Sequence, residues 1–280
     1  MSSRRQKIRP ETKVLLKQIG IGALVFGLLA LFITGVWHGT RLPAVTIDEI
    51  NVYGGETIKH RVIEEIVAAE LSGDYLGLIP KRFTWTYPES RIIDSVSAID
   101  RVHSVEVSQT KRALSVSFDE YVPYALWCDG DLSSEKCLFL DETGLAFSKA
   151  PVLSGGTYLR FVTSGEQMEV GKLVLPFDIF SMVNELVELL AANDWYVSRV
   201  ELDNVGDAFL TIVGGGELKV TIANPPEEIV DNLRAILASP EFSHLAPGNF
   251  QYIDLRFGSK VYINEEPAVP EIETASSTLG

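Results

Sequence analysis

The sequence has little cysteine and lacks the common motifs of catalysis and phosphate binding. Its 280 residues include 2 cysteines, which excludes a disulfide-rich scaffold and a cysteine-based zinc finger. Its 4 histidines have no partner at the spacing of metal ligands, although a zinc site needs three or four convergent ligands. Gly214-Gly215-Gly216 lacks the Gly-Lys-Ser/Thr ending of a phosphate loop, and no serine lies in a Gly-x-Ser-x-Gly elbow. We therefore expect no enzymatic activity, no cofactor and no metal.

Basic residues are scarce outside the N-terminus. The formal net charge of −14 argues against a general nucleic-acid-binding protein, because such proteins need a basic surface to displace counterions from phosphates. Residues 1–17 nevertheless hold six basic residues and one acid, so this segment carries +5 and the remainder carries −19. The sequence therefore has a short basic arm followed by a long acidic portion.

A long uncharged run follows the basic arm. Ile19 to Trp37 spans 19 mostly apolar residues, which as a helix extend about 28 Å, close to the ~30 Å hydrocarbon core of a bilayer. The alternative is a removable signal peptide, whose apolar region is usually shorter and ends in a small-x-small cleavage site. Lys and Arg beside a span tend to stay cytoplasmic, and Trp37 is suited to the outer interface. We expect a cytoplasmic arm at 1–18, a transmembrane helix at 19–38 and the rest outside the cytoplasmic membrane.

The next segment, residues 45–122, has the pattern of a small α+β domain. We expect a strand within 45–52, a helix after a cap at Thr57, a second helix opened by Pro88, and a hairpin around residues 110–113. The predicted order is β-α-α-β-β. The apolar residues at helical spacing are Ile58, Val62, Ile66 and Val67 on the first helix and Ile92, Val96 and Ile99 on the second.

Residues 123–263 are mostly strand-like. Helices are expected at 177–192 and from Pro225-Pro226 onward, and Gly258-Ser259 fits a two-residue hairpin turn. Expected strands are 124–127, 138–140, 158–162, 172–175, 197–202, 208–213, 217–222, 250–257 and 260–263. The fold class is thus α+β: one transmembrane helix, a β-α-α-β-β domain and a mostly antiparallel β domain with flanking helices. The acidic tail, residues 264–280, is expected to be disordered.

Cys128 and Cys137 are the one chemically suggestive pair. Eight residues lie between them, around a polar turn in the portion expected outside the cytoplasm. A disulfide would stabilise the fold by about 2–3 kcal/mol on the chain-entropy estimate. Two separate buried thiols are the alternative. A catalytic thiol has less support, because no histidine or helix start adjoins either residue.

Four motifs, in this order and spacing, resemble the bacterial cell-division family FtsQ, also called DivIB. They are Ile47-x-x-Ile50-x-Val52-x-Gly54, Glu120-x-x-Pro123-x-Ala125-x-Trp127, Leu140-Asp141-x-x-Gly144-x-x-Phe147 and Tyr252-Ile253-Asp254-Leu255-Arg256-Phe257. With the basic arm and the single span, the resemblance covers residues 5–263. It implies that residues 45–122 form a POTRA domain and that residues 123–263 form the β domain of this family.

The resemblance also implies a function. FtsQ-like proteins are non-enzymatic scaffolds at the division septum that bind FtsB- and FtsL-like single-pass proteins and so link early and late division proteins to septal peptidoglycan synthesis. The partner FtsB adds a strand beside the last β-strand. The matching positions here are Arg256, Phe257, Gly258, Ser259, Lys260, Val261, Tyr262 and Ile263.

Strand addition is physically reasonable, because a terminal strand leaves one row of backbone N–H and C=O groups unpaired. On a strand at 260–263, Val261 and Ile263 would face one side, and Lys260 and Tyr262 the other. An alternative role for Lys260 is to protect an exposed edge from aggregation. Alternative functions are another POTRA-bearing envelope protein acting in export or assembly, and an exported hydrolase on a membrane tether.

Overall fold

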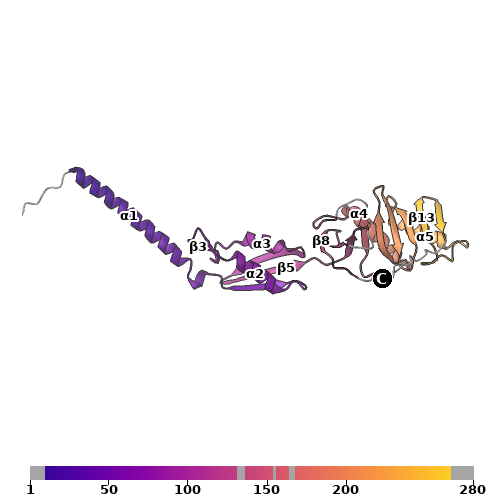
Figure 1. The fold of residues 1–280 in the computed structure, drawn as a ribbon, viewed down its shortest axis with the longest axis horizontal. Helices are drawn as coiled ribbons and strands as arrows, with labels where there is room; N and C mark the ends of the chain where they lie inside the picture. The colour runs from indigo at the N-terminus through magenta and orange to yellow at the C-terminus, as the bar shows by residue number, and fades with distance from the viewer. Residues whose placement is uncertain (1–9, 131–135, 154–155, 164–167, 266–280) are drawn as a thin grey trace, which may run out of the picture. The chain divides into compact units, whose positions relative to one another are not determined.

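A computed structural model of the protein describes residues 10–130, 136–153, 156–163 and 168–265. The chain divides into two compact units, Met1–Glu120 and Tyr121–Gly280 (Figure 1). The first nine residues of the expected cytoplasmic arm lie outside the described residues. So do nearly all of the expected disordered tail and most of the polar run between Cys128 and Cys137.

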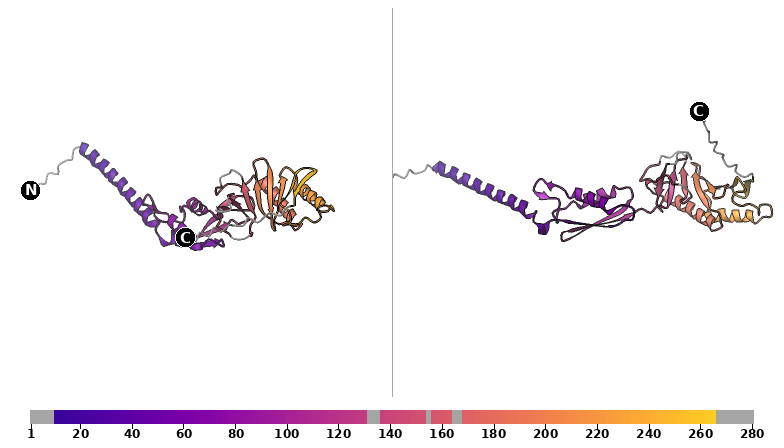
Figure 2. Two further views of the ribbon diagram at one scale, coloured as in Figure 1. Left: turned by 45° about the vertical axis from the view of Figure 1, so that its right-hand side comes forward. Right: turned by 60° about the horizontal axis from the view of Figure 1, so that its bottom comes forward.

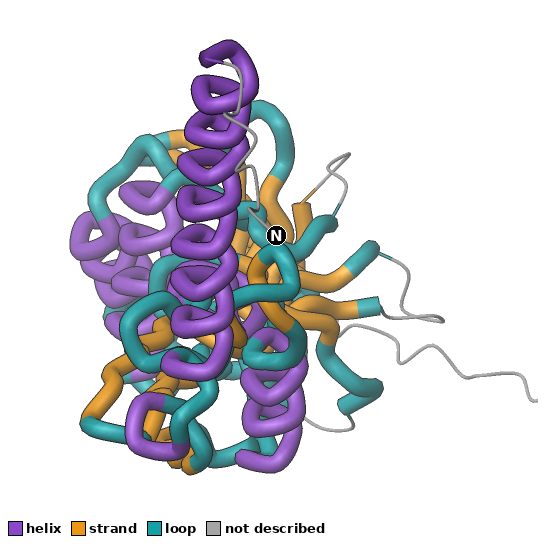
Figure 3. The backbone as a smooth tube through the Cα atoms, turned by 90° about the vertical axis from the view of Figure 1, so that its left-hand side faces the viewer, coloured by secondary structure: helices purple, strands orange, loops and turns teal. Residues whose placement is uncertain are grey.

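The first unit begins with α1 (Pro10–Gly39), a continuous helix of 30 residues (Figures 1 and 3). Its segment Val14–Gly39 is long and apolar enough to cross a membrane. The helix begins before the predicted span at 19–38, because Lys, Leu and Gln in the segment before residue 19 are themselves good helix formers, and it ends one residue after that span. Its 26-residue apolar segment measures about 39 Å, longer than the ~30 Å hydrocarbon core of a bilayer.

After a short 3-10 helix, η1 (Pro43–Val45), the unit forms a three-stranded sheet with two helices on one face (Figure 2). The elements are β1 (Glu49–Gly54), α2 (His60–Glu70), β2 (Asp74–Tyr75), β3 (Ile79–Pro80), α3 (Glu89–Ser97), β4 (Val102–Thr110) and β5 (Ala113–Glu120). The sheet order is β1-β5-β4, with β1 parallel and β4 antiparallel to β5. The predicted β-α-α-β-β order is confirmed, with the small β2–β3 hairpin inserted between the helices.

Two local predictions in this unit are wrong. Thr57 does not cap α2: the cap position is Lys59, without a side-chain hydrogen bond, and Thr57 donates instead to Glu120 at the end of β5. Val62 is 43% exposed, whereas Ile63 and Val67 are buried. Because the helix begins at His60, its buried stripe runs through these two residues and leaves Val62 at the margin.

The second unit is one nine-stranded sheet with two helices packed on one face. Its strands are β6 (Ala125–Cys128), β7 (Cys137–Leu140), β8 (Ala146–Lys149), β9 (Arg160–Thr163), β10 (Val197–Leu202), β11 (Asp207–Ile212), β12 (Glu217–Thr221), β13 (Tyr252–Phe257) and β14 (Lys260–Asn264). Their order is β14-β13-β12-β11-β10-β9-β6-β7-β8. The pairs β12–β13, β9–β10 and β6–β9 are parallel and the others antiparallel, so the sheet is mostly antiparallel as expected.

The core of this unit lies between the sheet and its helices, α4 (Phe177–Ala191) and α5 (Pro226–Leu237). The helices start after Pro176 and Pro225, consistent with proline preceding or opening a helix. The predicted strand at 172–175 is wrong, since that segment makes an isolated bridge, Leu145 to Leu173. Its hydrogen bonds go to the loop at 144–146, and Pro176 then ends any pairing.

Cys128 and Cys137 lie directly opposite each other, at the ends of β6 and β7 that the hairpin loop connects. A disulfide joins them. It closes the hairpin whose tip includes the undescribed residues 131–135. Of the three interpretations that the sequence leaves open, the structure therefore contains the disulfide.

Candidate protein-binding edge

The hairpin formed by β13 and β14 ends the nine-stranded sheet. Phe257 and Lys260 are paired, so Gly258-Ser259 forms the two-residue turn that the sequence predicts. Gly258 has φ of +62°, a conformation that glycine adopts without the cost imposed by a Cβ atom. Among the described residues, no strand lies on the outer side of β14. In an antiparallel strand every second residue directs its N–H and C=O away from its neighbour, so β14 presents a row of such groups outward.

The side chains of β14 alternate between the two faces of the sheet, as predicted. Val261 and Ile263 are partly buried and pack against the core beneath the helices. Lys260 and Tyr262 are on the opposite face, where Tyr262 is 53% exposed. The side chains of Val261 and Ile263 therefore anchor the strand, while no strand among the described residues pairs with its outer backbone row.

An aromatic pair flanks the turn. The rings of Phe257 and Tyr262 lie 5.3 Å apart, nearly perpendicular, and both side chains are 53% exposed. Such edge-to-face pairs are favourable, but their exposure leaves apolar area in contact with water. The pair is therefore an apolar surface immediately beside the outer backbone row of β14.

Cationic side chains lie over aromatic rings on the same face. The Nζ atom of Lys219 is 4.2 Å from the centre of the Tyr252 ring and 5.9 Å from that of Phe209. The guanidinium of Arg256 lies 5.6 Å from the Phe209 ring and 5.5 Å from the Phe257 ring. This face therefore combines aromatic rings with cationic side chains.

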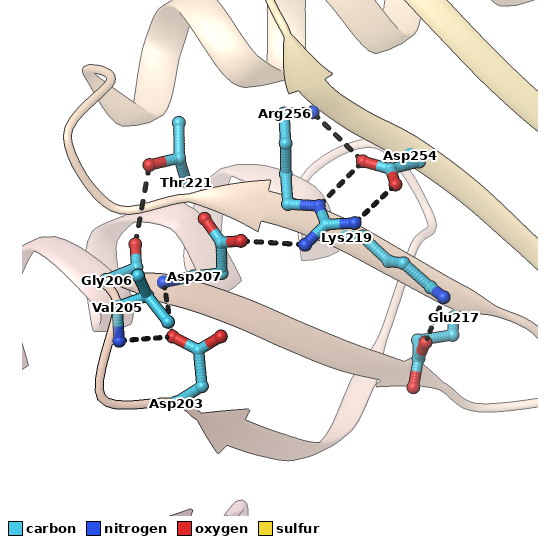
Figure 4. A network of polar contacts seen from close by, with 9 residues as sticks. All are labelled: Asp203, Val205, Gly206, Asp207, Glu217, Lys219, Thr221, Asp254 and Arg256. Atoms are coloured by element: carbon cyan, nitrogen blue, oxygen red, sulfur yellow. Dashed lines mark hydrogen bonds and ion pairs between the residues drawn. The ribbon is translucent and has the colours of Figure 1, made fainter.

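Arg256 is also the centre of a polar network that connects β13 with β11 across β12 (Figure 4). Its Nε and Nη2 atoms donate to the two carboxylate oxygens of Asp254, at 2.9 and 2.7 Å. Its Nη1 atom donates to Asp207 at 2.7 Å. Such paired, charge-assisted bonds are strong and fix the orientation of a guanidinium. Arg256 thus uses its guanidinium donors in hydrogen bonds to residues of the same sheet.

Two carboxylates in this region, Asp254 and Asp203, have lowered pKa values. The hydrogen bonds from Arg256 hold the pKa of Asp254 below its ordinary value, although burial acts in the opposite direction. Asp203 accepts hydrogen bonds from the backbone N–H groups of Asp207 and Val205, which lower its pKa and fix the β10–β11 turn. Both shifts come from structural hydrogen bonds, so neither indicates a catalytic acid.

The eight predicted partner-binding residues therefore fall into three groups. The exposed residues around the turn are Phe257, Gly258, Ser259, Lys260 and Tyr262. The half-buried residues, which pack against the core, are Val261 and Ile263. The third group is Arg256 alone, which forms ion pairs with two aspartates. Sequence reasoning missed Phe209, Lys219 and Tyr252. The available signal was strand alternation, which places each of them opposite the buried side chains of its strand.

The described residues contain no group of three or more His, Cys, Asp or Glu side chains placed to hold a metal ion. A pocket of about 330 Å³ lies near Pro176, and its one carboxylate among the described lining, Asp203, is already bonded to backbone N–H groups. The chain matches no protein-family model and no curated protein sequence.

Proposed function

We propose that this protein is a non-enzymatic, single-pass membrane scaffold of the bacterial divisome. Its β14 edge would bind an extended segment of an FtsB- or FtsL-like partner outside the cytoplasmic membrane. The observation that carries this proposal is the outer backbone row of β14, with which no strand among the described residues pairs, beside the exposed aromatic pair Phe257 and Tyr262. The resemblance of the chain to the FtsQ family supplies the class of partner.

The chemistry of this edge suits an added strand. Main-chain hydrogen bonds would supply affinity, and contacts of alternate side chains would supply specificity. The partner's side chains on one face would meet Phe257 and Tyr262, which favours an aromatic or aliphatic residue there. Lys260 beside the turn favours an acidic residue at the adjacent position.

The proposed membrane topology of the chain is based on α1. A helix long and apolar enough to cross a membrane follows a basic N-terminal segment, which supports a cytoplasmic N-terminus and two extracytoplasmic units. The proposed location is the cytoplasmic membrane at the division septum, where the scaffold would link early and late division proteins to septal peptidoglycan synthesis.

Val261→Pro tests strand addition. The pairing register of the hairpin shifts between Asp254 and Phe257 and gives Val261 no direct partner in β13, so proline there should leave most of the hairpin intact. Proline removes an N–H and fixes φ, which disfavours an added strand. We expect affinity for the partner's extracytoplasmic segment to fall roughly tenfold or more, the equivalent of about one lost backbone hydrogen bond.

The assay measures binding of the full chain, held in nanodiscs, to the extracytoplasmic segments of the FtsB- and FtsL-like proteins of the same cell. The wild-type chain and the Val261→Pro variant are compared. Val261→Thr is the matched control, because it keeps the β-branched shape and the N–H. Circular dichroism shows that each variant is folded. Wild-type affinity in the proline variant would refute strand addition at β14, and absence of binding by folded wild-type protein would refute the proposed partners.

A further inference from the structure

The end of α1 is tied to the β2–β3 hairpin by a single arginine. The Nη1 atom of Arg41 donates to the carbonyl oxygen of Trp37 at 3.1 Å and to that of Leu78 at 2.7 Å. Its Nη2 atom pairs with Asp74 at 2.9 Å, and its guanidinium lies 4.4 Å from the centre of the Trp37 ring. Because one nitrogen bonds both carbonyls, the hairpin tip is adjacent to Trp37, the last aromatic residue of the apolar helix.

The segment after the helix is fastened to the same region by backbone contacts. The N–H of Ile47 donates to Arg82, the N–H of Thr84 donates to Val45, and Thr46 is bridged to Phe83. Residues 41–47 are therefore held against residues 74–84 at several points. The hairpin is part of a fixed structure at the end of α1.

This structure exposes large apolar side chains. Leu76 at the hairpin tip is 97% exposed, Trp85 is 81% exposed and Leu42 is 55% exposed. Leu76 has φ of +51° and Gly77 has φ of +72°, in a turn closed by a hydrogen bond from the Leu78 N–H to Tyr75. Such turns favour Asn or Gly at the position of Leu76. A leucine there is unfavourable both in backbone conformation and in its contact with water.

A lipid surface would remove the second disadvantage, the contact of the Leu76 side chain with water. Trp37 is where an aromatic residue at the outer membrane interface is expected, and the hairpin tip lies beside it. Lys81 and Arg82, both partly exposed, follow β3 directly. Apolar side chains together with basic ones are the composition of segments that lie in the headgroup region.

We propose that the β2–β3 hairpin docks onto the outer surface of the membrane. Leu76 enters the boundary between headgroups and acyl chains, Trp85 lies at the interface, and Lys81 and Arg82 meet lipid phosphates. The first unit is then fixed in height and orientation on the bilayer. This inference rests on the membrane anchoring by α1 in the proposed function.

The test uses the full chain reconstituted into vesicles of phosphatidylethanolamine and phosphatidylglycerol. A nitroxide is attached to Leu76→Cys, and intact mass shows that each chain carries one label. Paramagnetic resonance then compares collisions of the label with oxygen, which enriches in lipid, and with an aqueous nickel chelate. Lys59→Cys is the matched exposed control before α2, Trp85→Cys is a second interface position, and Leu24→Cys reports the interior of α1.

We expect the labels at positions 76 and 85 to collide severalfold less with the nickel chelate than the label at 59, and to collide more with oxygen. If the label at 24 is in lipid while those at 76 and 85 behave like the label at 59, the docking is refuted and the anchor stands. Shielding at 76 from both reagents would also refute it, because that result indicates coverage by protein. Nickel access at position 24 would overturn the anchor and this inference together.

Discussion

Replacement of Arg256 by methionine separates a structural role of this residue from a role in partner binding. The resemblance to the FtsQ family places Arg256 among the partner-binding residues, whereas the structure engages it with Asp254 and Asp207. Methionine retains much of the apolar stem and removes all guanidinium donors. The Asp254 side chain is only 8% exposed, so it is left ionised with little access to water.

The size of the effect follows from that burial. Asp207 is 25% exposed and can be rehydrated after the substitution. Asp254 cannot be rehydrated without rearrangement, and removal of one partner of a buried ion pair costs about 3–5 kcal/mol. Because Arg256 itself is 24% exposed and water can partly enter its place, we take the lower end, about 3 kcal/mol. For a unit of this size the loss lowers Tm by roughly 6–12 °C.

The destabilisation should depend on pH. In the native protein the pKa of Asp254 is lowered, chiefly by its hydrogen bonds to Arg256. A carboxylate with a lowered folded pKa contributes stability that is complete above its unfolded pKa, near 3.9, and is lost as pH falls through the folded pKa. The difference in unfolding free energy between wild type and Arg256→Met should therefore be largest at neutral pH and shrink as the solution is acidified, because the unpaired, buried Asp254 of the variant can take up a proton.

Chemical denaturation and partner binding are both measured for this variant. Arg199→Met is the matched control. Arg199, on β10, lies on the same face of the sheet as Arg256 but forms one longer ion pair, with Glu201 at 3.5 Å. In Arg256→Met/Asp254→Asn the buried charge is removed, and most of the lost stability should return. If this restored double variant binds the partner like wild type, Arg256 is structural. Unchanged stability of Arg256→Met would refute the argument from burial.

Two further predictions concern other parts of the chain. Burial raises the pKa of Glu120, but hydrogen bonds from Thr57 and from the N–H groups of Ile58, Thr57 and Glu56 outweigh it and hold the pKa below its ordinary value. Glu120→Gln should destabilise the first unit by about 1–2 kcal/mol at pH 7 and by less below the ordinary pKa of glutamate, near 4.3. The measurement is hydrogen exchange at residues 56–58. Asp119→Asn is the control variant, because the Asp119 carboxylate accepts a hydrogen bond from the exposed Ser104 hydroxyl and none from residues 56–58. Unchanged protection of residues 56–58 in Glu120→Gln would contradict the prediction. For Cys128 and Cys137, intact mass without reductant should show the oxidised pair, and reduction should cost about 2–3 kcal/mol; quantitative labelling of both thiols in the native protein would rule the bond out.

The elements that sequence predicts well are those with local physical causes. The helices α3, α4 and α5 follow prolines and carry apolar stripes at helical spacing, and both were visible in the sequence. The turn at Gly258-Ser259 is likewise fixed by its own residues. By contrast, β8 consists of Ala146–Lys149, which lack the β-branched residues typical of strands. Its conformation depends on pairing with β7, and no local pattern reports that pairing.

The candidate site shows the same division between local and distant causes. Strand alternation correctly predicted that Val261 and Ile263 share one face of β14 and that Lys260 and Tyr262 share the other. It could not predict that Arg256 pairs with Asp207, because that partner lies on β11, two strands away and 49 residues earlier. Thr57 was misassigned for a similar reason, since its partner Glu120 is 63 residues distant.

The network around Arg256 also changes what the motif Tyr252–Phe257 can mean. Two of its polar residues, Asp254 and Arg256, bond to each other and hold the sheet together. A sequence could therefore retain this motif because its fold requires the pair, whether or not its edge binds a partner. Partner binding must then be judged at positions that the fold does not need: the exposed Phe257, Lys260 and Tyr262, and the outer backbone row of β14. A variant that weakens binding without loss of stability at those positions is evidence for the scaffold, whereas loss of both at Arg256 is not.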